Sequence, residues 1–463
     1  MSIAQQIKTE SKGRSAPVQV LRTKAETALA DAFAAVERRL PGGDWLRQLR
    51  RAAAGAFAAE GLPHRRVEEW KFTDLRTLMR DAFPFAPPAA APKPAAIEAM
   101  VRDALPGADL TKAFAAIVDG QGAGEAGLAS ISKLDGAFLS RFIDHPPAWI
   151  EAEIGEVGGH VTDGVLALNT ALFTEGIALD IADGREIETP VALIFGDAGG
   201  EARSVVTRNA VRVGKGAKLV LVECHLAPTA PRQVNTLTQL VIGDGAEVVH
   251  IKLVASREGS IHLGRTVARL GANASYRPFQ MVAGDGVVRN DLAVTFGGQH
   301  STFDLGSAKL VDGHGHADTT LVVDHAVPHC TSRELVKCVL ADEARAVFQG
   351  KVIVRPHAQK TDGKQMAQAL MLSPNAEFDS KPELEIYADD VVCGHGSTSA
   401  EIDPELIFYL RSRGIPLEEA QAMLVESFVG EAIDKAEPET VQGALRGLAR
   451  GWLKREAPGR SAV

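Results

Sequence analysis

Val211-Arg-Val-Gly-Lys-Gly-Ala-Lys-Leu-Val-Leu-Val222 joins two strand-forming runs through a glycine corner. The same arrangement returns 29 residues later around Gly243-Asp-Gly-Ala246, and 28 residues after that around Gly271-Ala-Asn-Ala274. Strand-forming runs that repeat at a spacing of roughly 20–50 residues indicate a solenoid or a propeller. Propeller blades carry sharper motifs than these corners. The pattern therefore favours a parallel β-helix, whose stacked coils bury Val, Leu and Ile and cover one another's strand edges.

Residues 1–81 are predicted to form an N-terminal helical domain. Apolar side chains recur at spacings of three and four over residues 21–40 and again over residues 44–61, as in two amphipathic helices. The mixed-charge stretch 61–75 is interpreted as a surface segment held by one aromatic side chain. Residues 82–110 are assigned as a Pro/Ala-rich linker, because their proline-rich first part sustains neither a helix nor a strand ladder.

The parallel β-helix is predicted to occupy residues 111–400, with regular coils from about residue 189 and a last strand that ends near His395. Residues 401–463 are predicted to form a C-terminal helical domain. Its first helix has the capping residue Asp403 followed by a proline at the first helical position. A later helix carries one apolar stripe, made of Ala420, Met423, Leu424 and Phe428. This stripe fits either a lid on the last coil or a docking surface for another protein.

Composition excludes several classes of protein. With 45% apolar and 24% charged residues, the chain has an ordinary soluble balance, and its net charge of -9 leaves no basic field for nucleic acid. Four scattered cysteines do not make a disulfide framework and favour a reducing cytoplasm. The N-terminus lacks an apolar signal core, and no apolar run approaches the roughly 18 residues of a membrane span. We therefore expect a cytoplasmic protein that is neither exported nor membrane-spanning.

Candidate metal ligands lie in Val391-Val-Cys-Gly-His-Gly396. In an extended strand Val391, Cys393 and His395 share one face, because side chains alternate across a strand. A thiolate and an imidazole on one face can converge on a soft or borderline metal, and they leave a tetrahedral centre half filled. The other ligands would come from elsewhere in the fold or from another chain. The alternative is a small buried cysteine beside a histidine that is satisfied by ordinary polar contacts.

Other candidate sites are weaker. No Gly-x-x-x-x-Gly-Lys-Ser/Thr stretch occurs, so nucleotide hydrolysis of the P-loop kind is not expected. Neighbouring carboxylates at Asp389 and Asp390 would point to opposite faces of a strand, which argues against a catalytic pair. His314 and His316, with Asp312 and Asp318 nearby, could make a small metal site, but a solvated loop explains them better.

Several longer stretches resemble the SufB/SufD family of iron–sulfur cluster assembly proteins. They are residues 61–75, Ala358–Gly363, Lys381–Val391, Cys393–Thr398 and Phe408–Ile415. The first stretch and the scarcity of cysteines in the C-terminal half favour the SufD branch of the family over the SufB branch. Gly394 stands where the family has a serine between its cysteine and histidine, which loosens the backbone but changes neither ligand.

The resemblance implies a right-handed parallel β-helix between helical ends, in a non-catalytic scaffold subunit of the SufB–SufC–SufD complex. It implies a SufB-type partner bound through the β-helix and a SufC-type ATPase bound through the C-terminal helices, with a homodimer possible for the isolated chain. It also implies a transient iron or iron–sulfur cluster at Cys393 and His395, shared with the partner subunit, and no cofactor in the isolated chain. The side chains expected to bind the ATPase are Phe408, Tyr409, Met423, Leu424 and Phe428.

Two other classes of protein remain alternatives. A β-helix enzyme acting on carbohydrates needs acid and base carboxylates that converge on an open groove, and it usually carries an export signal. Neither feature is visible in the sequence. A purely structural solenoid would differ from the metal-handling subunit in showing no metal binding even when its partner chain is present.

Overall fold

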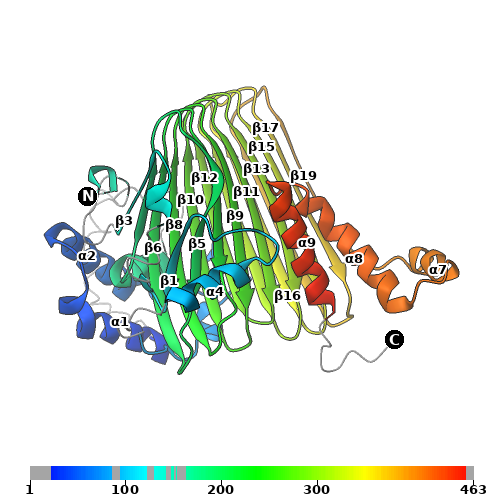
Figure 1. Ribbon diagram of the computed structural model, residues 1–463, viewed down its shortest axis with the longest axis horizontal. Coiled ribbons are helices and arrows are strands. Elements are labelled where there is room, and N and C mark those ends of the chain that lie inside the picture. Colours follow the sequence, from blue (N-terminus) through cyan, green and yellow to red (C-terminus); the bar gives the residue numbers. More distant parts are fainter. Residues whose placement is uncertain are drawn as a thin grey trace, which may run out of the picture.

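The computed structural model describes residues 22–85, 94–122, 130–141, 147–150, 153 and 163–454. Its centre is a β-solenoid of about 8 turns, flanked by N-terminal and C-terminal helices (Figure 1). Strands make up 42% of the structure, so the chain is mainly β. The predicted parallel β-helix between two helical regions is confirmed.

Two long sheets form the solenoid. Sheet A contains, in spatial order, β3 (Ala137–Arg141), β4 (Ile177–Ile181), β6 (Arg203–Val213), β8 (Arg232–Ile242), β10 (Ile261–Leu270), β12 (Val287–Phe296), β14 (His316–His325), β16 (Arg345–Val354) and β18 (Glu377–Ile386). Sheet B contains β2 (Gln121–Gly122), β1 (Phe114–Val118), β5 (Glu186–Gly196), β7 (Lys218–His225), β9 (Glu247–Ser256), β11 (Ser275–Gly284), β13 (Thr302–Val311), β15 (Thr331–Leu340), β17 (Asp362–Met371) and β19 (Val392–Glu401). Among the strands of the described residues, only the pairs β1–β2 and β3–β4 are antiparallel.

The corners of successive coils stack on one another. Gly216 and Gly245 have φ angles of +64° and +66°, and Asn273 takes the same place in the next corner with a φ of +55°. Glycine and asparagine are the residues that adopt this left-handed conformation most readily. The amide of Gly216 donates to the carbonyl of Asp244 at 2.8 Å, and that of Gly245 to the carbonyl of Ala272 at 2.7 Å. The repeating corners therefore hold neighbouring coils in register.

Inward-pointing side chains fill the solenoid. Leu219 and Leu221 of β7, Leu240 and Ile242 of β8, and Val248 of β9 are each at most 2% exposed and belong to one core. Complete burial of such a side chain stabilises a fold by about 1.5–3 kcal/mol. The core therefore runs between the two sheets, and the helices pack on the outside.

The N-terminal helices pack on the outer face of sheet A. They are α1 (Lys24–Val36), η2 (Glu37–Arg39), α2 (Asp44–Glu60), η3 (Glu68–Trp70) and α3 (Leu75–Leu78), joined by α6 (Gly164–Leu172); a short turn, η5 (Ile131–Lys133), adjoins β3. Thr23 starts α1 because its hydroxyl accepts from the amide of Glu26, whose side chain caps Thr23 in return. Both predicted helices are present, and residue 21, where the first predicted pattern begins, lies outside the described part of the chain.

The interpretation of residues 61–75 as a surface segment held by one aromatic side chain is correct in part, because Arg65, Arg66, Glu68 and Lys71 are exposed while Trp70 is buried. Trp70 is 1% exposed and lies against sheet A, with the guanidinium of Arg289 3.8 Å from the centre of its ring. Its indole N–H donates to Asp163 Oδ2 at 3.1 Å. A cation over an aromatic face and a satisfied indole N–H both require close packing. The buried side of the segment therefore forms a tightly packed joint between the N-terminal helices and the solenoid.

We expect this joint to weaken as the pH falls from about 6.5 towards 4. Burial lowers the pKa of His316 to about 4, and its ring contacts the hydroxyl of Thr73 at 2.9 Å. Released histidine titrates near 6.5, so below that pH the undocked state binds a proton that the docked state excludes. The docked state should lose about 3 kcal/mol by pH 4. Protection factors from hydrogen exchange over residues 61–78 measure the loss.

His316→Gln is the control for this titration, since glutamine can still bond Thr73 but carries no proton in this range. Protection in this variant should change much less between pH 7 and pH 4.5. An equal loss in both proteins would assign the weakening to another group.

The predicted linker is partly wrong. Within residues 82–110 the structure contains α4 (Pro94–Ala104), whose Ile97 and Val101 are buried against the outer face of sheet B. Proline stands at the first position of this helix, where its missing N–H costs no hydrogen bond. Residues 86–93, which hold most of the Pro/Ala run, lie outside the described residues.

The C-terminal region contains α7 (Pro404–Ser412), α8 (Leu417–Ile433) and α9 (Glu439–Leu453). Val425 and Val429 of α8 and Leu445 of α9 are buried against the outer face of sheet B. These helices cover the side of the solenoid and leave the last coil open at its end, so the lid alternative is wrong (Figure 1). None of the helices in the described residues is long and apolar enough to cross a membrane.

Candidate functional site

The last coil of the solenoid presents two open strand edges. β18 ends sheet A and β19 ends sheet B, and neither has a further neighbour among the described residues. β19 pairs with β17 from Val392 to Glu401, so the last strand extends six residues beyond its predicted end near His395 and stops close to residue 400, where the β-helix was predicted to end. An open edge offers a row of unpaired N–H and C=O groups to another chain.

Exposed apolar side chains surround these edges. They are Met366 of β17, Ile386 of β18, Tyr387 in the following turn and Val392 of β19. Apolar side chains gathered beside unpaired backbone groups mark an interaction surface better than either feature alone. We call this region the open end. It consists of the side chains of Met366, Ile386, Tyr387 and Val392 together with the edges of β18 and β19.

Cys393 and His395 lie on one face of β19 within the open end, as their spacing predicts. Cys393 is half-buried and packs against the core between the sheets, which places this face towards the interior. His395 is exposed, because no further coil covers it. A thiol and an imidazole are thus presented together, one against the core and one towards whatever binds the open end.

The surroundings of Cys393 keep it protonated. Burial raises the pKa of its thiol, the carboxylates of Asp362 and Glu334 raise it further, and the backbone of Gly363 partly opposes them. A methyl group added at Gly363 would lie 3.7 Å from the sulfur and 3.3 Å from the hydroxyl of Ser332. The glycine therefore leaves the interior side of the sulfur uncrowded. A metal that displaces the proton can supply the stabilisation that the thiolate lacks here.

Glu334 is a polar neighbour that sequence reasoning missed. It lies on β15, in register with Gln365 of β17, which is in register with His395. Burial raises the pKa of Glu334 to about 8. A glutamate at an inward position of a strand is unusual, and the sequence alone could have singled it out for that reason. Only the register of the strands shows that Glu334 lies on the same face of sheet B as Cys393 and His395.

The second candidate metal site does not assemble. His316 is buried against Thr73, whereas His314 is exposed and its Nδ1 lies 3.3 Å from Glu343 Oε2. Across the described part of the chain, no group of three or more His, Cys, Asp or Glu side chains is placed to hold a metal ion. Cys393 and His395 accordingly form a pair rather than a complete site.

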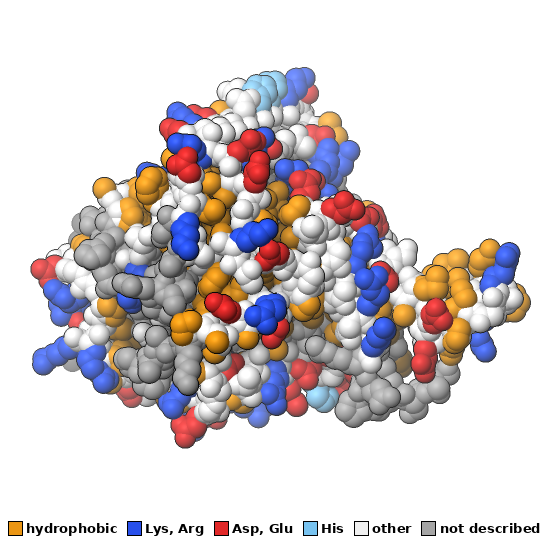
Figure 2. Space-filling view, viewed as in Figure 1, with side chains coloured by type: hydrophobic (Ala, Val, Ile, Leu, Met, Phe, Trp, Pro, Cys, Tyr) orange, Lys and Arg blue, Asp and Glu red, His pale blue; other side chains and the backbone are white. Residues whose placement is uncertain are grey.

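An apolar surface projects from the C-terminal helices. α7 has no buried residue, and its Phe408 is 75% exposed beside exposed Leu406 and Tyr409. Met423 of α8 is 46% exposed. Figure 2 shows orange side chains over the projecting arm where Figure 1 places α7. We call these four side chains, Leu406, Phe408, Tyr409 and Met423, the arm surface.

One of the side chains expected to bind the ATPase takes part in the packing of the chain itself. Phe428 is partly buried against the core beneath α8, with Lys337 Nζ 4.6 Å from its ring centre. Leu424 is half-buried. The other three, Phe408, Tyr409 and Met423, belong to the arm surface, and Leu406 was not among the expected residues.

Comparison with known proteins gives consistent matches over most of the chain. The family model described as SUF system FeS cluster assembly, SufBD core domain, matches residues 195–428, and the SufBD protein N-terminal region matches residues 23–193. An iron–sulfur cluster assembly SufBD family protein of Synechocystis sp. is 30% identical over 412 residues, or 86% of this chain and 89% of the relative. The iron–sulfur cluster assembly protein SufD of Escherichia coli is 30% identical over 385 residues, 82% of this chain and 86% of the relative.

Proposed function

Because the chain belongs to the SufBD family of iron–sulfur cluster assembly proteins and is a homologue of SufD, we propose that it is a non-catalytic scaffold subunit of a SufB–SufC–SufD complex. The observation that carries the proposal is the open end, where unpaired edges of β18 and β19 stand beside Cys393 and His395. Its role is to help acquire iron and assemble clusters where it meets SufB.

The SufB-type partner binds at the open end. A partner strand can add to the edge of β18 or β19 through main-chain hydrogen bonds, and Tyr387 and Val392 supply apolar contact area beside them. In the absence of SufB the same edges can pair with a second copy, which gives a homodimer of the isolated chain. Either arrangement removes the exposed edges from water.

Iron or an iron–sulfur cluster is the cargo of this interface. Cys393 supplies a thiolate once its proton is lost, and His395 supplies an imidazole nitrogen, both suited to a borderline metal. The partner completes the coordination, so the cargo is held transiently and only in the complex. Scattered cysteines with no disulfide framework suit the reducing cytoplasm in which such chemistry can run.

The SufC-type ATPase binds the arm surface. Phe408 and Met423 on two successive helices offer apolar area that the chain does not cover itself. An exposed apolar patch on a projecting arm is typical of a docking surface. Movement of the arm surface, driven by ATP hydrolysis in the bound ATPase, would then open or close the interface that holds the cargo.

Co-expression with SufB-type and SufC-type subunits of the same organism tests the assembly. We expect size-exclusion chromatography to yield one species that contains all three subunits. Separate elution of the three subunits would overturn the scaffold role. Elution with SufC alone would leave the arm surface in place and refute pairing at the open end.

We expect the isolated chain to show no ATPase activity and to bind iron weakly. Two ligands on one face leave a tetrahedral centre half filled, and the Cys393 thiol must also lose a proton whose pKa burial raises. Iron retained after desalting, measured by a colorimetric assay, should be well below one equivalent per chain. Stoichiometric iron that survives desalting would point to a complete site within this chain.

A further inference from the structure

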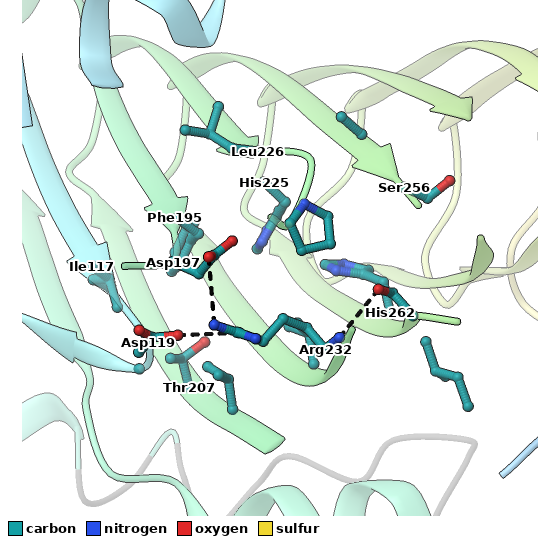
Figure 3. Close-up of a pocket in the computed structure, with 18 of the residues that line it drawn as sticks. Ile117, Asp119, Phe195, Asp197, Thr207, His225, Leu226, Arg232, Ser256 and His262 are labelled. Carbon is teal, nitrogen blue, oxygen red and sulfur yellow. Dashed lines mark hydrogen bonds and ion pairs between the residues drawn. The ribbon is translucent and has the colours of Figure 1, made fainter. Parts of the chain in front are cut away.

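A cavity of about 60 Å³ opens into the solenoid where β5, β7 and β9 end and β6, β8 and β10 begin. His225 and His262 point into it (Figure 3). A water-sized group needs roughly 10–15 Å³ of such space, so the cavity can hold about four or five non-hydrogen atoms. Most of its walls are apolar, and they include Ile117, Phe195, Leu226, Val234 and Ile261.

The charged side chains that line the cavity are bound to one another. Arg232 is buried, with its Nε 3.2 Å from Asp119 Oδ1 and its Nη2 3.4 Å from Asp197 Oδ1. The second oxygen of Asp119 accepts from the amide of Ala198 at 3.0 Å, and that of Asp197 accepts from the amide of Thr229 at 2.9 Å. A charged ligand would therefore lose its hydration without gaining a free partner among these groups. The cavity favours an uncharged ligand.

His225 is held in one orientation. Its ring stacks on that of Phe195, with the ring centres 4.4 Å apart and the planes 12° apart. His262 meets the same ring edge to face, with the centres 4.5 Å apart. Its Nε2 lies 2.7 Å from Glu223 Oε1, which is also 3.0 Å from Lys252 Nζ. The imidazole is thus fixed by its neighbours, and the other ring nitrogen, Nδ1, is left for a ligand.

Nδ1 of His225 is a hydrogen-bond acceptor. Burial opposes ionisation of Glu223, but Lys252 and the hydrogen bonds from His225 and His250 hold its pKa well below the usual range. Glu223 is therefore ionised and can only accept, so the Nε2 that faces it carries the proton. Burial, partly opposed by Glu223, lowers the pKa of His225, which keeps the ring neutral and leaves a lone pair on Nδ1. This nitrogen makes no hydrogen bond with any described residue.

We propose that the cavity binds one small uncharged alcohol of about four or five non-hydrogen atoms, whose hydroxyl donates a hydrogen bond to His225 Nδ1. The apolar walls cover the hydrocarbon part of the ligand. A thiol is a weaker donor, and a primary amide would leave an N–H unpaired among apolar side chains. The cavity lies at the other end of the solenoid from Cys393, so the proposal does not depend on the function proposed above.

The probes are n-butanol and its isomer methyl propyl ether, used with the full-length chain. The two molecules contain the same atoms, but only the alcohol has an O–H donor. In a titration of isotope-labelled chain followed by NMR, we expect n-butanol to shift the resonance of His225 Nδ1 until it saturates. The ether should bind about tenfold more weakly, which corresponds to about 1.4 kcal/mol, because it leaves Nδ1 without a donor. Butyrate and n-butylammonium should not bind.

Val234→Phe fills the cavity without changing His225. Val234 faces the interior from β8, in register with His262 of β10, and it is only partly buried. We expect this variant to lose the n-butanol titration. Val241→Phe is the matched control, since it makes the same change at a partly buried position on the outer face of the same strand. The control should bind n-butanol as the unaltered chain does.

Comparison of the alcohol with the ether needs no substitution, so it decides the question if Val234→Phe fails to fold. Crystals soaked in n-butanol should show the alcohol beside His225. Equal binding of the two isomers, or binding of butyrate or n-butylammonium, would overturn the proposal. So would unchanged binding in a folded Val234→Phe chain, or ordered water alone in the soaked crystals.

Discussion

Phe408→Glu combined with Met423→Glu is expected to abolish copurification of the chain with a SufC-type ATPase. Both side chains are exposed, at 75% and 46%, and neither belongs to the core beneath α8 and α9. A carboxylate forced into an apolar interface without a partner costs several kcal/mol. Two such charges should lower the affinity by roughly a hundredfold or more, at about 1.4 kcal/mol for each tenfold. Affinity capture followed by calorimetry measures the loss.

Phe138→Glu is the matched control for this double variant. Phe138 is 64% exposed on β3, at the other end of sheet A, so the same chemical change falls far from the arm surface. Capture of the ATPase should be unaffected in this control. Full capture by the double variant would place the docking surface elsewhere. A loss of thermal stability in the double variant would show that these side chains belong to the fold.

The repeating coil could be predicted because its determinants are local. Corners that need a left-handed residue place Gly216, Gly245 and Asn273 at nearly equal spacing, and inward side chains alternate with outward ones between them. Both features are visible in a window of about 30 residues. The end of the last strand was less predictable, because β19 continues to Glu401 through pairing with β17 rather than through its own side chains.

The apolar stripe of α8 could be predicted, but not which neighbour each side chain meets. The sequence shows that Leu424 and Phe428 lie close together on one apolar stripe. Only the structure shows that Val425 and Val429 pack against sheet B and that Phe428 is partly buried beside them. The tail therefore divides into packed α8–α9 and the free arm of α7. The alternatives of lid and docking surface could not be separated without that arrangement.

Contacts distant in sequence were beyond sequence reasoning. Trp70 contacts Arg289 and Asp163 across the boundary between the N-terminal region and the solenoid. No local sequence pattern predicts these contacts. The polar interior left a weak signal, because Glu223 and His225 continue the inward alternation of β7 where apolar residues are expected. Their meaning depends on Lys252, which only the register of the strands brings opposite Glu223.

Cys393→Ala and His395→Ala are each expected to leave assembly of the complex intact and to lower cluster formation about tenfold or more. Both side chains lie on β19 at the open end, where each substitution removes one ligand; His395 is exposed, and Cys393 is only partly buried against the core. Changes even to residues that only support metal ligands typically cost 10–100-fold in affinity or activity. The resemblance to the family places the larger effect at His395, whereas geometry alone ranks the two residues equally.

Subunit stoichiometry by chromatography and reconstituted cluster by visible absorbance should be measured on the same samples, so that failed assembly is distinguished from failed chemistry. Ser397→Ala is the control on β19 two residues beyond His395, and His314→Ala is the control for an exposed histidine away from the open end. Both should keep the full cluster yield, because neither supplies a proposed ligand. Full cluster yield in the Cys393→Ala/His395→Ala double variant would mean that the pair is structural, and that the cargo is held wholly by the partner subunit.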